Sequence, residues 1–244
     1  MLTFGVIALD SDLIIEEISK TIAKIINVNI IIAKIKLPNN VIHMDTFIQT
    51  YNNHAIDIAI RSLQEMSPDI WGIACTSLCF SLGKERLDNV FMRALDTNHP
   101  PIYINMMDSV LKALATIGRK NLIVLSPYND ETHACTLKQF EQYNIAISKN
   151  LNFASDEVTS AFSPCNIHIE VRGLVDLYHT LHDKASHDGV IFIACSAFNV
   201  INEITNMEKD IGMPIVTSLQ AFFWDLVDYN NINEGINYGK LFET

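Results

Sequence analysis

The sequence predicts an α/β protein of two pseudo-symmetric Rossmann-like lobes, each a short parallel sheet flanked by helices. The first observation is a repeated apolar run: residues 70–77 read IWGIACTS, and residues 190–197 read VIFIACSA. Uncharged runs of this kind are typical of strands buried on both faces of a parallel sheet. The second observation is that such runs alternate with helix-periodic segments, which favours right-handed βαβ units.

The two runs also occupy matching places in the two halves. They put Cys75 and Cys195 120 residues apart, and the strands that follow begin at Pro101 and Pro214, 113 residues apart. Similar but unequal spacings indicate the same wiring with different loop lengths. Because ligands bind at the carboxyl ends of strands in open α/β sheets, we expect the active site in the cleft between the lobes.

The elements of the first half follow from apolar runs, helix periodicity and chain breaks. Asp10-Ser11-Asp12 supplies a turn and an N-cap, while Pro38 and Pro100 stop the chain before new elements. The predicted strands are 2–9, 28–35, 70–74 and 102–104. The predicted helices are 13–26, 54–66, 84–95 and 105–117.

The second half repeats this plan. Ser126 to Asp130 reads as a turn with an N-cap, and Gly212 and Pro214 end a helix before the last strand. The predicted strands are 121–125, 145–147, 190–194 and 214–216. The predicted helices are 131–143, 174–184, 200–211 and 221–229. The expected organisation is an N-terminal lobe at 1–117, a C-terminal lobe at 118–218, and a closing helix and tail at 219–244 that pack back on the first lobe.

The composition restricts the class of partner. The 244 residues include 17 Lys and Arg against 28 Asp and Glu, a net charge of −11, which argues against nucleic acid or an anionic membrane surface. No apolar run is long enough to span a membrane, and the N-terminus lacks the basic start of a signal peptide. Five cysteines in a chain of this length are no disulfide framework, so we expect a reducing cytoplasm.

Cys75 and Cys195 are the candidate reactive groups. A single buried cysteine is usually a structural residue. Two at equivalent strand ends, each followed by a small residue and an expected helix start, favour reactivity because a helix N-terminus lowers a thiol pKa and holds anions. Cys79, Cys135 and Cys165 lack this setting and are interpreted as structural.

Other chemistries have weaker support. There is no Cys-x-x-Cys, no His-x-x-x-His and no glycine-rich phosphate loop, so neither a metal nor a nucleotide cofactor is expected. Tyr128 follows the first strand of the second half, which puts its phenol at the same cleft. Thr76, Ser77 and Ser196 are compatible with both capping and substrate binding, since both use the same end of a helix.

Motifs over most of the chain resemble the aspartate/glutamate racemase superfamily, in the branch of arylmalonate decarboxylases and maleate cis-trans isomerases. The resemblance follows the motifs CTSLCF, DG with the Cys195 strand, GMPIV, AFFWD and YGKLF, in that order. It implies a cofactor-free enzyme that acts next to the carboxylate of a small acid. The family varies in oligomeric state, so a homo-oligomer stays open.

The resemblance also implies site residues. Racemases and maleate isomerases place two cysteines across the substrate, and the matching positions are Cys75 and Cys195; decarboxylases keep only the second thiol. The chain therefore follows the racemase and isomerase pattern, with an arylmalonate-type decarboxylase that uses Cys195 as proton donor as the alternative. The oxyanion-binding residues carry over to Thr76, Ser77, Tyr128 and Ser196.

The first loop departs from both branches. Decarboxylases have Pro-Pro there and maleate isomerases Asn, whereas this chain has Asp10-Ser11-Asp12. Asp10 and Ser11 are further candidates for substrate binding. A carboxylate beside a substrate carboxylate is repulsive, so either Asp10 and Asp12 point away as helix caps or the substrate carries an ammonium group. A non-catalytic two-lobed binding protein for small molecules is the remaining alternative.

Overall fold

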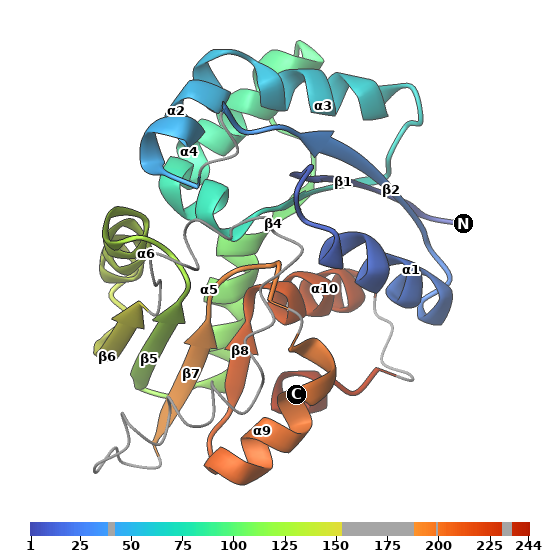
Figure 1. Cartoon of the computed structure of the whole chain (residues 1–244). Helices are drawn as coiled ribbons and strands as arrows, with labels where there is room; N and C mark the ends of the chain where they lie inside the picture. The colour runs from blue at the N-terminus through green and yellow to red at the C-terminus, as the bar shows by residue number, and fades with distance from the viewer. Residues whose placement is uncertain (39–41, 153–187, 199, 231–235) are drawn as a thin grey trace.

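Two four-stranded parallel sheets flanked by helices make up the chain (Figure 1). The computed structural model describes residues 1–38, 42–152, 188–198, 200–230 and 236–244. The predicted fold class is confirmed, because uniformly apolar runs became parallel strands with helices between them.

The first sheet has the strand order β2-β1-β3-β4. The central strands β1 and β3 pair from Phe4 with Ile70 to Ala8 with Ala74, which aligns their carboxyl ends. All five residues of β3 are buried, as the uncharged run predicts. The strands are β1 Thr3–Leu9, β2 Asn29–Ile35, β3 Ile70–Ala74 and β4 Tyr103–Asn105.

The second sheet repeats this wiring with the order β6-β5-β7-β8. Its central strands pair from Asn121 with Gly189 to Leu125 with Ile193, and β7 is buried throughout, like β3. The strands β3 and β7, which precede Cys75 and Cys195, therefore occupy the same position in the two sheets. The strands are β5 Asn121–Ser126, β6 Ile147–Asn152, β7 Gly189–Ile193 and β8 Ile215–Thr217.

Helices cover the sheets and join them. In the first lobe α3 lies on β1 and β2 beside α4, while α1 lies on the other side of the sheet (Figure 1). Helix α5 packs along α10, which closes the chain. The helices are α1 Ile14–Ile25, α2 Met44–Asn52, α3 Ala55–Gln64, α4 Thr76–Leu95, α5 Met106–Ile117, α6 Asp130–Gln142, α9 Ile204–Ile211 and α10 Ser218–Tyr229, with short 3-10 turns η2 Ile201–Glu203 and η3 Lys240–Glu243.

Helix α10 also reaches the centre of the first sheet. The ring of Phe222 lies 5.6 Å from that of Phe4 on β1. A Cβ at Gly72 of β3 would lie 2.5 Å from Phe4 Cζ and 2.8 Å from Phe222 Cζ, so only glycine lets the two rings cover this strand. The proposed division into 1–117, 118–218 and 219–244 stays a prediction.

Three elements differ from the sequence expectation. Helix α4 spans Thr76–Leu95, but Gly83 interrupts it with non-helical angles (φ 72°, ψ 168°). The predicted helix 84–95 is its second part, and the first part, residues 76–82, was not among the predicted ranges. Helix α2 was not predicted; its buried residues include two threonines beside Phe47, so it lacks an apolar stripe. Strand β6 lies at Ile147–Asn152 rather than 145–147, since this edge strand (ISKNLN) is mostly polar and lacks the apolar run that marks the other strands. The predicted helix 174–184 and Cys165 lie outside the described residues.

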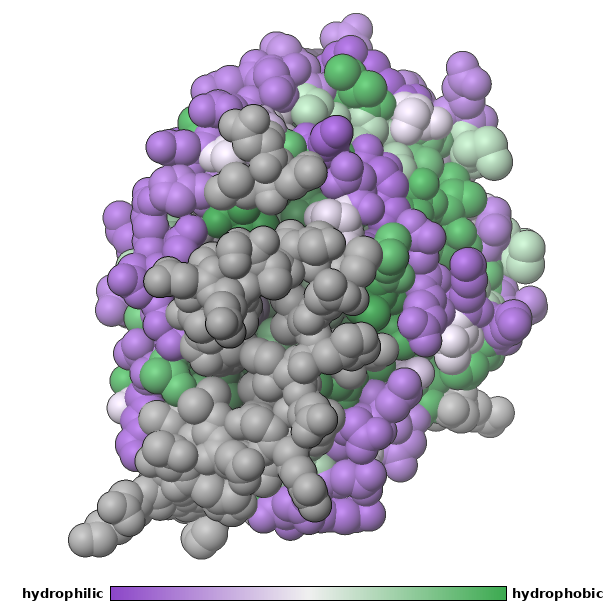
Figure 2. Space-filling model, viewed as in Figure 1, coloured by the Kyte–Doolittle hydropathy of each residue, from purple (hydrophilic) through white to green (hydrophobic). Residues whose placement is uncertain are grey.

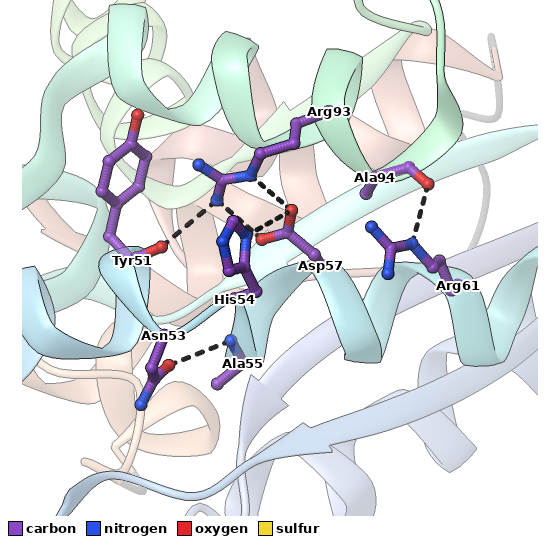
Figure 3. Close-up of polar contacts among 8 residues, drawn as sticks. All are labelled: Tyr51, Asn53, His54, Ala55, Asp57, Arg61, Arg93 and Ala94. Atoms are coloured by element: carbon purple, nitrogen blue, oxygen red, sulfur yellow. Dashed lines mark hydrogen bonds and ion pairs between the residues drawn. The ribbon is translucent and has the colours of Figure 1, made fainter.

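A buried ion pair fastens the helices of the first lobe (Figure 3). The Asp57 carboxylate of α3, fully buried, accepts from Arg93 of α4 through Nε at 2.5 Å and Nη2 at 2.7 Å. Arg93 also donates to the Tyr51 carbonyl at the end of α2 and stacks on its ring. His54 contacts the same carboxylate at 3.3 Å. One charged group thus ties α2, α3 and α4 together behind the first sheet.

The surface fits the acidic composition. On the face drawn in Figure 2, hydrophilic residues form most of the visible rim. In the part of the chain that the structure describes, no helix combines the length and apolar character needed to cross a bilayer.

Candidate active site

Cys75 lies where β3 ends and α4 begins. Its extended backbone (φ −147°, ψ 109°) makes it the N-cap of α4, and its carbonyl accepts the N–H of Cys79 at 3.0 Å. Its Sγ lies 3.7 Å from Oγ of Ser77. The thiol therefore stands at a helix N-terminus, where the first N–H groups have no acceptor within the helix.

Cys195 has a different setting. It follows β7, but its φ of 95° lies in a region that side chains other than glycine rarely adopt. A turn at Ser196 and Ala197 follows, and within the described residues the next helical turn is η2 at Ile201–Glu203. The expected helix start after each thiol is therefore right for Cys75 and wrong for Cys195. Backbone strain of this kind concentrates at functional sites, where surrounding packing holds it.

Tyr128 is held by the turn after β5. The side chain is only 2% exposed. The preceding Ser126 hydroxyl hydrogen-bonds His133 Nδ1 at 2.7 Å, and His133 Nε2 contacts Asn150 Oδ1 at 3.1 Å. This buried chain of polar groups joins β5, α6 and β6, and it fixes the turn that presents the phenol.

These strand ends meet around one small cavity of about 20 Å³. The structure brings the predicted residues Cys75, Cys195, Thr76, Ser77, Tyr128, Ser196 and Ser11 together in its wall. Among the described residues, Leu9, Asp12, Ile42 and Ala197 also line it. The sequence reasoning weighed Asp12 as a helix cap or as a partner of a substrate ammonium group, and it missed the other three. Two of these positions could have been predicted from the sequence. Leu9 ends β1 and Asp12 lies just beyond it, as Cys75 lies just beyond β3, and ligands bind at the carboxyl ends of such strands.

The two carboxylates of the first loop lie apart. Asp10 is exposed, does not line the cavity, and donates its backbone N–H to the Ile35 carbonyl at 2.9 Å. Asp12 is 3% exposed, lines the cavity, and accepts the N–H of Ile15 at 3.1 Å through Oδ1. Asp12 is therefore both a helix cap and a cavity residue, two roles that the sequence reasoning treated as alternatives.

The segment before α2 crosses to the second lobe beside the cavity. Asn129, the N-cap of α6, donates from Nδ2 to the Ile42 carbonyl at 3.1 Å. His43 Nε2 lies 2.6 Å from the Glu131 carboxylate. These two contacts hold Ile42 against the cavity.

Burial controls the ionisation of both thiols. It raises the pKa of the Cys75 thiol to about 11, against the N–H groups of Leu78 and Ser77, which favour the thiolate. Burial, followed by the nearby Asp12 carboxyl, raises the pKa of the Cys195 thiol to about 12. The expectation that a helix N-terminus leaves Cys75 with a lowered pKa is therefore wrong, because desolvation outweighs the helix donors.

The pKa values of Tyr128 and Asp12, which also line the cavity, are raised as well. Burial and then the two thiols raise the pKa of Tyr128 well above its ordinary value. Burial raises the pKa of Asp12, against hydrogen bonds from Ser196 and Ile15 and the charge of Lys34. Among the described residues that line the cavity there is no Lys, Arg or His side chain. Neutral hydroxyl, phenol and N–H donors around a small space suit an anionic ligand.

Within the described residues, no group of three or more His, Cys, Asp or Glu side chains is arranged to hold a metal ion. Cys79, which also lies on α4, donates to the Ile73 carbonyl at 3.6 Å and is not part of the cavity lining.

Comparisons with known proteins agree with this arrangement. The family model for arylmalonate decarboxylase matches residues 40–242. Arylmalonate decarboxylase from Bordetella bronchiseptica is 22% identical over 203 residues, 82% of this chain and 79% of that protein. The maleate isomerase Iso from Pseudomonas putida S16, solved with maleate, is 16% identical and has a TM-score of 0.74, covering 99% of this chain and 97% of that one. A maleate cis-trans isomerase from Nocardia farcinica, solved with a covalently bound succinylcysteine intermediate, is 11% identical and has a TM-score of 0.81, covering 99% and 98%.

Proposed function

The chain belongs to the arylmalonate decarboxylase family, and from this premise we propose that it is a cofactor-independent two-cysteine isomerase of a small carboxylic acid. Enzymes of this family include arylmalonate decarboxylase and maleate isomerase, and relatives bind small carboxylates. The observation that carries the proposal is that Cys75 and Cys195 both line one small cavity. A decarboxylase needs a single thiol as proton donor, whereas an isomerase uses two thiol groups in different roles.

The proposed roles rest on the difference between the thiols. Cys75 is the N-cap of α4 and has the N–H groups of that helix beside it, which favour a thiolate, so it is the nucleophile. Cys195 is not at the start of a described helix, and burial keeps its thiol protonated at neutral pH, so it is the proton donor. Tyr128, Thr76, Ser77 and Ser196 surround the cavity as hydrogen-bond donors.

With a cis-alkene diacid as substrate, the reaction begins at the double bond. The Cys75 thiolate forms a C–S bond to one alkene carbon, and the π electron pair moves onto the neighbouring carbon and its carboxylate. The donors around the cavity stabilise this enediolate, and Cys195 delivers a proton to the carbon. After rotation about the new single bond, Cys195 takes the proton back, the C–S bond breaks, and the trans acid leaves. Racemisation of an acid would use the same two thiols as bases on opposite faces of a planar intermediate.

Decarboxylation of an arylmalonate is the second candidate function. It is favoured by the family model and by the sequence similarity to a decarboxylase. In that reaction the enediolate forms by loss of CO₂, and Cys195 alone protonates it.

Turnover by matched variants distinguishes these functions. Purified wild type and the variants Cys75→Ser, Cys195→Ser and Cys79→Ser are incubated with maleate and with phenylmalonate, and products are followed by proton NMR. The proposal expects fumarate from the wild type and from Cys79→Ser, which keeps the hydrogen bond to Ile73 on the same helix, and none from the other two. Loss of CO₂ from phenylmalonate that needs Cys195 but survives Cys75→Ser, without action on maleate, would identify the decarboxylase instead. Full isomerase activity in Cys75→Ser or Cys195→Ser contradicts the two-thiol reaction.

A further inference from the structure

The two oxygens of Asp12 have different partners. Oδ1 accepts the backbone N–H of Ile15 at 3.1 Å. Oδ2 is buried and has no hydrogen-bond partner among the residues that the structure describes. Ser196 across the cavity lowers the pKa of this carboxyl, but it forms no hydrogen bond with Oδ2 that meets normal geometry. A buried polar atom that faces a ligand cavity without a partner is expected to be paired by the ligand.

The charges around Asp12 leave it without a counter-ion in the cavity. Three other titratable side chains line the cavity beside Asp12, namely the thiols of Cys75 and Cys195 and the phenol of Tyr128, and all three are neutral. From β2, Lys34 approaches the same loop, but its Nζ donates to the backbone carbonyls of Asp12 at 2.7 Å and Leu9 at 3.2 Å. The Lys34 ammonium also pairs with Glu16 of α1 at 2.9 Å.

An ionised Asp12 would therefore be a buried anion whose nearest cation is engaged elsewhere. Burial of an unpaired carboxylate is costly, and the usual outcome is that the group stays protonated. A substrate carboxylate in the cavity increases this tendency, because two anions in a desolvated site repel.

We propose that Asp12 binds a carboxylate of the substrate in its neutral form, with Oδ1 as the acceptor from Ile15 and Oδ2–H as the donor to the substrate. This assignment rests on the proposed function for the identity of the ligand as a small dicarboxylate. Asp12 is then a substrate-binding residue, and the affinity for a diacid depends on whether Asp12 is protonated. This assignment also removes the conflict between an acidic first loop and an acidic substrate. The competing assignment, an ionised Asp12 that binds a substrate ammonium group, requires the unpaired buried anion in the free protein.

The test measures binding rather than turnover. Succinate is the probe, because it is a saturated diacid that cannot be isomerised. Its affinity is measured by titration calorimetry between about pH 6.5 and 9, where succinate is fully ionised and both thiols stay protonated, in two buffers of different ionisation enthalpy. Wild type is compared with Asp12→Asn. The amide of this variant keeps an oxygen that accepts from Ile15, and its NH₂ group is a donor that does not depend on pH. Asp10→Asn, an exposed position outside the cavity, is the matched control.

The expected result is a wild-type affinity that falls up to about tenfold per pH unit above the pKa of Asp12, with proton uptake on binding that rises from none below that pKa to one proton above it. Asp10→Asn should behave like the wild type. Asp12→Asn should bind succinate without this pH dependence and without proton uptake. If Asp12→Asn does not fold, as judged by circular dichroism, the proton uptake of the wild type in the two buffers still decides the question.

Four results would overturn the assignment. They are a wild-type affinity that rises with pH, no succinate binding by the wild type, loss of succinate binding in Asp12→Asn at every pH, or a wild-type preference for aspartate over succinate that Asp12→Asn abolishes. Failure of the proposed function looks different. Succinate binding with the predicted proton uptake, together with no turnover of maleate, refutes the isomerase and leaves the Asp12 assignment in place.

Discussion

The thiol of Cys75 is expected to stay protonated in the ligand-free protein up to strongly alkaline pH. Its pKa is raised from an ordinary 9.0 to about 11 by burial. The thiolate fraction at neutral pH is then about a hundredfold lower than for an ordinary cysteine, because each unit of pKa is a factor of ten. Ionising Cys75 at about pH 7.5 costs roughly 5 kcal/mol, which substrate binding has to offset.

Alkylation by iodoacetamide measures this directly, since the thiolate is the reacting species. The perturbation is pH, raised in steps from about 7 to 10.5, and the labelled peptides are quantified by mass spectrometry. The slope is the diagnostic quantity, because burial slows the reagent at every pH. The logarithm of the Cys75 rate should rise by about one per pH unit without a plateau below about pH 10. Cys135, which is only partly buried, serves as the internal reference.

A plateau of the Cys75 rate below about pH 8.5 would refute this reasoning. It would mean that the N–H groups of α4 outweigh burial and that the thiolate is already formed before substrate arrives. The same argument predicts that kcat for isomerisation rises with pH over the neutral range, because the nucleophile becomes more abundant.

Other predictions concern single side chains. Tyr128→Phe should lower kcat by about tenfold to a thousandfold, as loss of one oxyanion donor does, with unchanged circular dichroism; an unchanged kcat removes Tyr128 from the reaction. Arg93→Ala should destabilise the fold by about 3 kcal/mol in urea unfolding, because it leaves the buried Asp57 carboxylate with His54 alone and without its guanidinium partner. Arg119→Ala breaks only the exposed pair with Asp188 and should cost less than about 1 kcal/mol; equal losses in the two variants would contradict the role of burial. Although burial opposes it, hydrogen bonding to Arg93 and His54 holds the pKa of Asp57 below its ordinary value, so its stabilisation is complete above about pH 4 and is lost as the pH falls further. Acid unfolding followed by circular dichroism should show this loss in the wild type but not in Arg93→Ala.

Strand ends were the part of the site that sequence reasoning could locate. The uncharged runs that end at Cys75 and Cys195 predict buried parallel strands, and the carboxyl ends of parallel strands meet at one edge. The structure places both thiols in one cavity with Tyr128. Their roles in catalysis stay predictions until they are measured.

The backbone beyond each strand end was less predictable. The structure has the break at Gly83 that the sequence indicated, but the helical turns from Thr76 up to that break were not among the predicted ranges. The chain after Cys195 turns at a positive φ, which depends on surrounding packing rather than on local sequence. The sequence also could not decide which acidic residue of the first loop faces inward. Asp10 and Asp12 are chemically alike and two residues apart, and only tertiary packing separates them.

A covalent intermediate on Cys75 is the most direct test of the two-thiol reaction. The variant Cys195→Ser is incubated with maleate, quenched in acid, and examined by intact-mass and peptide mass spectrometry, with Cys75→Ser treated in the same way. The proposed reaction predicts that Cys195→Ser gains the mass of one maleic acid and that the adduct lies on Cys75, whereas Cys75→Ser gains nothing at the cavity. An adduct that lies on Cys79 or Cys135 instead, or wild-type conversion of maleate with no adduct trapped in Cys195→Ser, would contradict it.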